Sequence, residues 1–218
     1  TSHFFMDELY GLLAAAGIKA KVCNLFKHST GINKFYEYWK NGENVFELII
    51  HDENGKTVMD EMGLDLALQL YNWDIFNMQE GMSPHRTTTP QKIAEERYEA
   101  HTALVSHIRE QLPNAKFYYQ EIWAYEIGFK RLDYHMASKE QQLAFSASVK
   151  EYTNIVCREF HLDTIPCGSA WVIARKNPLA QKLCASLFVF RRTIAHTSLF
   201  FARSIMVNGT LISPSFIV

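Results

Sequence analysis

The residue of this sequence best placed for covalent chemistry is Ser2, which lies four residues before a predicted helix over Met6–Ala16. A serine hydroxyl becomes a nucleophile when it sits at a sharp strand-to-helix turn and a base can take its proton. Ser2 falls where such a turn would lie. Position alone favours two simpler roles, a helix N-cap or a frayed terminal residue. The role of Ser2 therefore depends on what the fold places beside it.

Polar residues also gather where predicted strands end. The apolar run Ile75–Met78 stops at Gln79-Glu80-Gly81. Two later runs have the same form, Lys116–Ile122 ending near Trp123 and Thr164–Pro166 ending in Cys167-Gly168-Ser169. Strands buried on both faces read as short apolar runs, and ligand sites in open α/β sheets lie just past the strands' carboxyl ends. We therefore expect a site around these three ends, with the polar loop Lys27–Gly31 as a second candidate.

Helical patterns separate these strands. One covers Pro90–Leu112, with Thr89 as its N-cap. The next covers Ser138–Phe160, where Ser138 and Gln141 form a capping box. Strand–helix alternation predicts an α/β fold, a parallel sheet with helices on both faces. The remaining predicted elements are a strand over Ile18–Leu25, helices over Ile32–Lys40, Leu64–Leu70 and Ser169–Lys176, and a small hairpin insertion, Val45–His51 with Lys56–Met62, turning at Asp52–Gly55.

Several side chains near the strand ends are candidates for substrate contact. Glu80 and Glu121 could converge on a sugar hydroxyl or a cation, or could simply accept hydrogen bonds from neighbouring loop N–H groups. His85 lies in the loop Met82–Thr89, which is long enough to form a lid and is expected to be solvated. Trp123 and Tyr125 could line an apolar pocket wall, although aromatic residues at strand ends more often belong to the core. Ser169 reads as the N-cap of the following helix.

Composition limits the classes of function. A chain of 218 residues with a formal net charge of −1 is typical of one α/β domain and indicates neither a nucleic-acid nor a membrane partner. Nine histidines without metal-ligand spacing and four cysteines without a CxxC pair predict no metal and no cofactor. No apolar run approaches the ~20 residues of a membrane span. Reduced thiols and a cytoplasmic setting are the default, although a chain that begins without Met suggests a fragment.

The end of the chain differs in composition from the rest. From Thr164 to Val218 there are six Lys and Arg and no acidic residue. We therefore predict one domain over residues 1–184 and an atypical tail over residues 185–218 that is foreign to the fold. An altered reading frame near Cys184 would explain such a tail.

Five short motifs together resemble the SGNH/GDSL hydrolase superfamily, in the branch defined by the domain of unknown function 4886. The first, Thr1-Ser-His-Phe-Phe5, resembles the end of its first block, and the second, Asn24-Leu-Phe…Ser29-Thr-Gly31, resembles its second block. The other three are Trp73-Asp-Ile…Met78-Gln-Glu80, Gln120-Glu-Ile-Trp-Ala-Tyr125 and Ile165-Pro-Cys-Gly-Ser-Ala-Trp171…Ala174-Arg175. Their order and spacing carry the resemblance over about Thr1 to Cys184.

The resemblance implies a flavodoxin-like three-layer fold and hydrolysis of an acetyl or acyl ester, most often on a carbohydrate. Ser2 would be the nucleophile. The backbone N–H groups of Ser2 and Gly31 and the Gln79 side chain would form the oxyanion hole. The family's first strand and its last block, Asp-x-x-His, have no clear match. His196 is a displaced match for that histidine, but Thr193 stands where the acid belongs, so His196 also fits an unrelated tail.

Two rival functions remain. A non-catalytic carbohydrate-binding or interaction domain on the same fold gains weight from the missing Asp-x-x-His block. A third mechanism would use Thr1 as an N-terminal nucleophile with its own amine as base, but that chemistry is usual on stacked antiparallel sheets. The substrate, the natural termini and the oligomeric state are not predicted.

Overall fold

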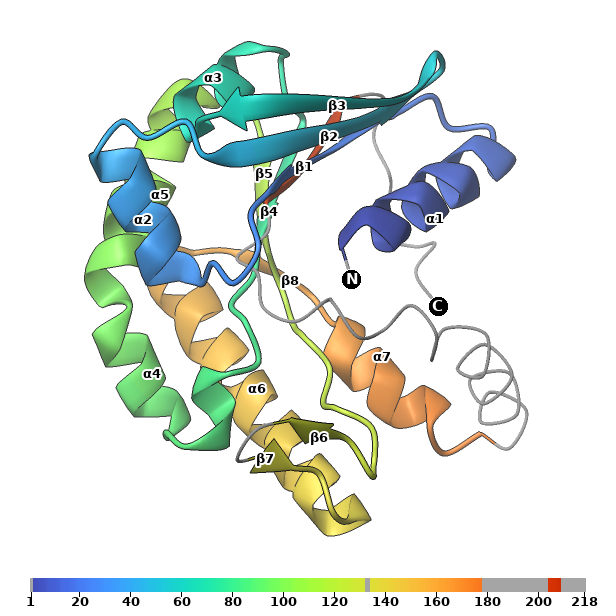
Figure 1. The fold of residues 1–218 in the computed structure, drawn as a ribbon, viewed down its shortest axis with the longest axis vertical. Coiled ribbons are helices and arrows are strands. Elements are labelled where there is room, and N and C mark those ends of the chain that lie inside the picture. Colours follow the sequence, from blue (N-terminus) through green and yellow to red (C-terminus); the bar gives the residue numbers. More distant parts are fainter. Residues whose placement is uncertain (1, 132–133, 178–203, 209–218) are drawn as a thin grey trace.

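A seven-stranded sheet runs through the molecule (Figure 1). The computed structural model describes residues 2–131, 134–177 and 204–208, with the backbone alone for residues 2–7, 131 and 204–208. The strand order is β3-β2-β1-β9-β4-β5-β8. The strands are β1 (Lys21–Phe26), β2 (Phe46–Asp52), β3 (Gly55–Met62), β4 (Ile75–Met78), β5 (Lys116–Gln120), β8 (Asp163–Ile165) and β9 (Ser204–Asn208), and β6 (Lys130–Arg131) pairs separately with β7 (Tyr134–His135).

Four of these strands point the same way. β4 pairs in parallel with β5, and β5 with β8. β1 and β4 each pair antiparallel with β9, so β1 runs parallel to β4 across it. The carboxyl ends of β1, β4, β5 and β8 therefore meet at one edge of the sheet. The α/β class predicted from the sequence is confirmed, in a mixed rather than purely parallel sheet.

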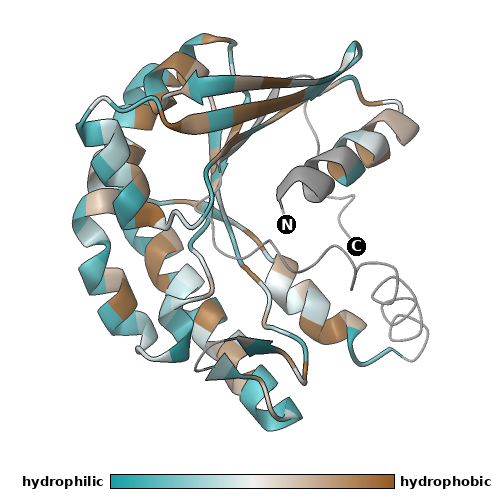
Figure 2. Ribbon diagram, viewed as in Figure 1, coloured by the Kyte–Doolittle hydropathy of each residue, from teal (hydrophilic) through white to brown (hydrophobic). Residues whose placement is uncertain are grey.

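Helices lie on both sides of this sheet. Figure 1 shows α1 and α7 on one side and α2, α4, α5 and α6 on the other. The helices are α1 (Ser2–Ala15), α2 (Ile32–Lys40), α3 (Leu64–Gln69), α4 (Pro90–Glu96), α5 (Tyr98–Gln111), α6 (Lys139–Phe160) and α7 (Cys167–Ala174), with a short 3-10 turn, η1 (Pro84–Arg86). Apolar residues line the strands where the helices cover them (Figure 2).

The main core fills the space between the sheet and α2, α3, α5 and α6. Leu25, Phe76 and Tyr119 from the strands pack there with Leu104 and Tyr152 from the helices, all essentially inaccessible to solvent. Burying one large apolar side chain contributes about 1.5–3 kcal/mol. A smaller cluster, with Leu13 of α1 against Val22 of β1, holds α1 on the opposite face.

Most local predictions are confirmed. β2 and β3 form the expected hairpin, with Asp52 paired to Gly55 and β3 at the exposed edge. Ser138 Oγ accepts a hydrogen bond from the Gln141 N–H at 3.2 Å and caps α6. The single helix predicted over Pro90–Leu112 is wrong, because the helix breaks at Arg97 into α4 and α5. The predicted solvated loop after Gly81 contains η1, whose His85 is buried.

One strand of the sheet comes from the predicted tail. β9 lies between β1 and β4, where residue 205 pairs with Asn24 on one side and Asn77 on the other. The tail therefore contributes to the sheet at residues 204–208. The predicted boundary at residue 184 lies outside the residues that the structure describes and stays a prediction.

The start of α7 packs directly against the chain that leaves β5. The Gly168 N–H donates to the Glu121 carbonyl at 3.1 Å, and a Cβ at Gly168 would lie 2.1 Å from the Ile122 carbonyl oxygen. The Ser169 N–H and hydroxyl donate to the Glu121 carboxylate at 2.9 and 3.0 Å. The prediction of Ser169 as N-cap is therefore wrong, since the helix begins earlier, at Cys167, and Pro166 takes that position.

Gly168→Ala should destabilise the protein by about 1–3 kcal/mol, because the neighbouring group is backbone and cannot move aside. Gly11→Ala is the matched control. It lies in α1 where an added Cβ meets no described atom within 4 Å, so it should stabilise by up to about 1 kcal/mol through helix propensity. Urea unfolding of the two variants measures both effects, and equal effects would contradict the close packing at Gly168.

Candidate functional site

Two of the predicted site residues, Gly31 and Glu80, meet at the carboxyl ends of β1 and β4. Gly31 is the N-cap position of α2, with φ −86° and ψ 177°. Any residue adopts these angles, so the backbone does not require glycine here. The lack of space does require it, because a Cβ at Gly31 would lie 2.9 Å from the Oε1 atom of Glu80. The two loops that follow β1 and β4 are therefore in direct contact.

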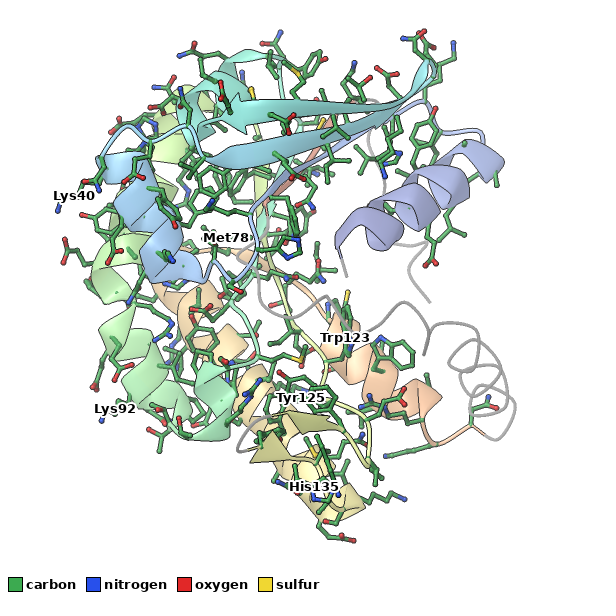
Figure 3. All side chains as sticks on the ribbon, in the orientation of Figure 1. Lys40, Met78, Lys92, Trp123, Tyr125 and His135 are labelled. Carbon is green, nitrogen blue, oxygen red and sulfur yellow. The ribbon has the colours of Figure 1, made fainter. Side chains whose placement is uncertain are left out.

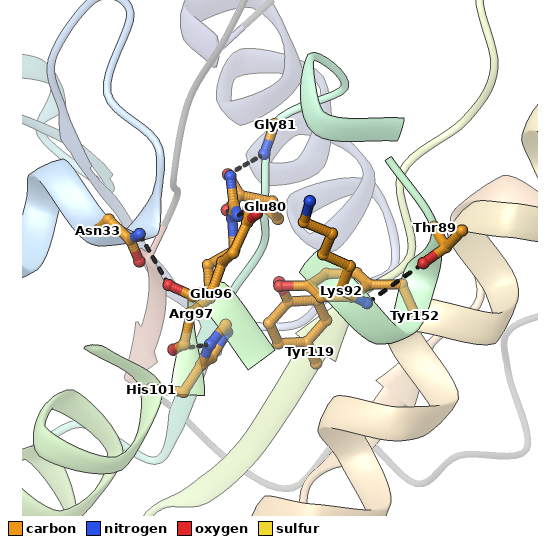
Figure 4. Close-up of polar contacts among 10 residues, drawn as sticks. All are labelled: Asn33, Glu80, Gly81, Thr89, Lys92, Glu96, Arg97, His101, Tyr119 and Tyr152. Atoms are coloured by element: carbon orange, nitrogen blue, oxygen red, sulfur yellow. Dashed lines mark hydrogen bonds and ion pairs between the residues drawn. The ribbon is translucent and has the colours of Figure 1, made fainter. Parts of the chain in front are cut away.

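The Glu80 carboxylate is buried and fully engaged (Figure 4). Its Oε2 atom accepts from the Nε of Arg97, and its Oε1 atom accepts from the Gly81 N–H at 2.6 Å. The side chain is 3% exposed and that of Arg97 is 15% exposed. Of the two roles open to Glu80 from sequence, the structure shows the internal one, hydrogen bonding to a neighbouring loop N–H, and adds an ion pair that the sequence did not indicate.

The Arg97 end of this pair lies at the break between α4 and α5. A helix break leaves backbone carbonyl groups without a partner in the helix, and here the Glu96 carbonyl is bound by a side chain of α2. The Asn33 side chain of α2 donates to the Glu96 carbonyl at 3.0 Å, while the His101 N–H and Nδ1 approach the Arg97 carbonyl at 3.0 and 2.9 Å. Asn33 lies two residues after Gly31. The helix break, the start of α2 and the end of β4 are thus joined by polar contacts (Figure 4).

Two buried histidines lie close to these contacts. His101 packs against Tyr119 and Tyr152, and His85 packs edge-on against Tyr152 with ring centroids 5.2 Å apart. Burial, with a smaller contribution from the nearby Arg97 charge, lowers the pKa of each histidine to about 4, and in His101 the hydrogen bond to the Arg97 carbonyl partly opposes this shift. A backbone carbonyl can only accept, so neutral His101 carries its proton on Nδ1. His85 approaches the Ser148 hydroxyl through Nδ1 at 3.3 Å.

Gln79 and Ser2 are the two other predicted oxyanion-hole and nucleophile residues that the structure describes. Gln79 follows β4 directly and is buried. Ser2 is the first residue of α1, so the helix begins four residues earlier than predicted and Ser2 occupies its first turn. The structure describes the backbone of Ser2 but not its side chain. His196 lies outside the described residues.

The two aromatic candidates lie farther along the chain that leaves β5. Figure 3 shows Trp123 beside α7 and Tyr125 beside β6 and β7. The Trp123 and Trp171 rings are 6.4 Å apart, and Tyr125 stacks on Phe129 at 4.1 Å. The Tyr125 hydroxyl accepts from Arg86 at 2.7 Å. Tyr125 therefore belongs to the core, the simpler of the two roles considered for it. Trp123 is partly exposed and stays a candidate for substrate contact.

A row of buried amides crosses the sheet at this site and was not predicted. Asn24, Asn77 and Gln120 are at most 2% exposed, and the Asn77 amide donates to Gln120 at 3.3 Å. Within the described part of the chain, the Asn24 amide has no hydrogen-bond partner. Asparagine is uncommon in strands, and its presence in two apolar runs was the only sequence signal for this row.

Other parts of the described structure have fewer features of a functional site. An open hollow of about 670 Å³ lies at the opposite edge, beside Lys116 and Asp163 at the starts of β5 and β8. Its Arg109 already donates to the Phe160 and His161 carbonyls at 2.7 and 3.0 Å. Among the described residues there is no cluster of three His, Cys, Asp or Glu that could hold a metal. None of the described helices is long and apolar enough to cross a membrane.

The buried histidines predict a dependence of stability on acid. Above pH ~6.5 both are neutral in the folded and unfolded states and contribute nothing. As the pH falls from about 6.5 to about 4, the unfolded chain binds protons first, so each histidine removes up to about 3 kcal/mol of stability. Urea unfolding of His101→Gln across this range should show a shallower pH dependence than the parent. An unchanged slope would contradict the burial of a neutral His101.

Comparison with known proteins gives one informative likeness. No protein family profile matches the chain, and no curated protein matches it. Its fold is similar to the crystal structure of a DUF4886 family protein from Bacteroides uniformis, with a TM-score of 0.63 and 20% identity over 77% of this chain. The match spans 63% of that protein, less than two thirds of its length. At this identity the likeness establishes a shared fold, and the neighbour comes from the branch that the sequence motifs resemble.

Proposed function

We propose that this chain is an SGNH/GDSL-type serine hydrolase with Ser2 as its nucleophile. Its substrate would be an acetyl or acyl ester of a carbohydrate or another small molecule. The proposal rests on the motifs at the strand ends, on the likeness of the fold to a DUF4886 protein, and above all on the position of the first turn of α1.

That position follows from how α1 packs. Leu13 contacts Val22, and Ile75 packs against the same cluster. From Leu13 back to Ser2 the helix rises about 16 Å, a length that about five strand residues also cover. Because α1 runs back alongside β1 (Figure 1), we infer that its first turn, with Ser2, lies level with the ends of β1 and β4, the edge where Gly31 and Gln79 lie.

The start of a helix suits the proposed chemistry. The first N–H groups of an α-helix have no partner within the helix, and its dipole favours negative charge there. In the proposed reaction the Ser2 hydroxyl attacks the ester carbonyl and a base takes its proton. The oxyanion that forms accepts from the N–H groups of Ser2 and Gly31 and from the Gln79 side-chain amide. Ser2 thereby supplies both the nucleophile and a helix-terminal donor.

The base is the open part of the proposal. His196 is the candidate that the resemblance supplies, and it lies outside the described residues. A histidine base needs a hydrogen-bonding partner to orient its ring. The buried His85 and His101 are poor substitutes, since each ring is packed against aromatic side chains and its pKa lies near 4.

Labelling with a fluorophosphonate probe tests the proposal. The folded chain should become labelled on Ser2, as located by peptide mapping, and Ser2→Ala should abolish the label. Gln79→Ala should slow labelling by about 10²–10³-fold, the usual cost of losing one oxyanion donor. Gln69→Ala, an exposed glutamine at the end of α3, should have no effect.

The outcome also separates the rival functions. Loss of labelling in His196→Ala would identify the base. No label on a chain shown to be folded by circular dichroism would overturn the hydrolase proposal. The non-catalytic carbohydrate-binding or interaction domain would then be the better description.

A further inference from the structure

The loop that carries Gly31 has a defined and partly strained backbone. Ser29 adopts φ +56°, the left-handed region that costs a non-glycine residue about 1–2 kcal/mol. Thr30 is buried, and its hydroxyl donates to the His28 carbonyl at 3.3 Å. A loop in this conformation needs contacts from outside itself to persist. The contact that the structure shows at its end is the one between Gly31 and Glu80.

The Glu80 carboxylate is a rigid neighbour for Gly31. Its two oxygens are held by the Arg97 side chain and the Gly81 N–H, and the charge is buried. Buried charge-assisted hydrogen bonds of this kind are strong and directional. The carboxylate therefore cannot swing away from Gly31 without losing both partners.

Arg97 is held in turn by the helix layer. Its backbone lies at the break between α4 and α5, and the flanking Glu96 carbonyl is bound by Asn33 of α2. Asn33 and Gly31 belong to the same end of α2. The end of the Gly31 loop is thus confined on one side by the Glu80 carboxylate and linked on the other, through Asn33, to the helix break.

We propose that Glu80 and Arg97 are positioning residues for the Gly31 N–H. They would fix this oxyanion donor relative to Gln79, which precedes Glu80 in the chain. The inference rests on the proposed function for its catalytic consequence, but its structural part stands apart from it. In this role Glu80 acts through Gly31 and does not contact the substrate. The role replaces the substrate binding that was expected from its position at a strand end.

Amide hydrogen exchange measured by NMR tests the structural part without any activity. In Glu80→Gln the amides of Gly31 and Gly81 should exchange at least tenfold faster, while those of β5 stay within twofold of the parent. Glu99→Gln is the matched control, because Glu99 also links α5 to α2, through the Tyr36 hydroxyl at 2.9 Å, but is exposed and away from Gly31. Unchanged exchange at Gly31 in Glu80→Gln would overturn the proposal.

A second comparison covers the case in which Glu80→Gln does not fold. Arg97→Lys keeps a cation beside Glu80 but removes the guanidinium, with its Nε donor to Glu80 and its Nη1 contact with the exposed Glu96 carboxylate at 3.3 Å, so Gly31 exchange should rise in the same way. Gly31→Ala should lower the urea midpoint in the parent chain but much less in a Glu80→Ala/Arg97→Met background, where the opposing carboxylate is gone. An equal loss in both backgrounds would show that Glu80 does not limit the space at Gly31.

The catalytic part is read from the fluorophosphonate reaction. Labelling of Ser2 in Glu80→Gln should slow at least tenfold, and in Glu99→Gln it should match the parent. A parent chain that is not labelled overturns the proposed function, while the exchange rates still decide whether Glu80 holds the loop. Labelling at the parent rate in a Glu80→Gln chain with fast Gly31 exchange would overturn the positioning role.

Discussion

The buried ion pair between Glu80 and Arg97 is the contact on which the strand-end region depends. Removing one member of such a pair leaves an uncompensated buried charge, which typically costs about 3–5 kcal/mol. Glu80 follows the end of β4 and Arg97 belongs to the helix layer, so the pair ties the two layers together where the apolar core ends. Loops at this edge cannot be held by hydrophobic packing alone, since their backbone groups need polar partners.

The elements that the sequence predicted well are those whose signals are local. The hairpin over Asp52–Gly55, the cap at Ser138 and the apolar run of β4 each depend on residues within a few positions of one another. The same holds for the ends of β4, β5 and β8, because a strand end can be read from where an apolar run meets polar residues. Gly31, Gln79 and Glu80 were found in this way or through the resemblance, and the fold brings Gly31 and Glu80 into contact.

The elements that were missed depend on distant partners. No Gly or Pro marks the helix break at Arg97, which is held by Glu80 and Asn33 from other parts of the chain. The start of α7 is set by Glu121, 48 residues before Ser169. The burial of His85 follows from packing against α6. The pairing of β9 with two strands from the first half of the chain has no local signal at all.

That pairing has a consequence for how the chain folds. The partners of β9 precede it by about 180 and about 130 residues, which is a high contact order for the centre of a sheet and favours slow folding. Until residues 204–208 leave the ribosome, β1 and β4 both present open edges that can pair with other chains. Asn24 and Asn77 lie on those two edges, and asparagine is a poor strand former. The same amides that are buried in the complete sheet therefore make its open edges less prone to pair with other chains during synthesis.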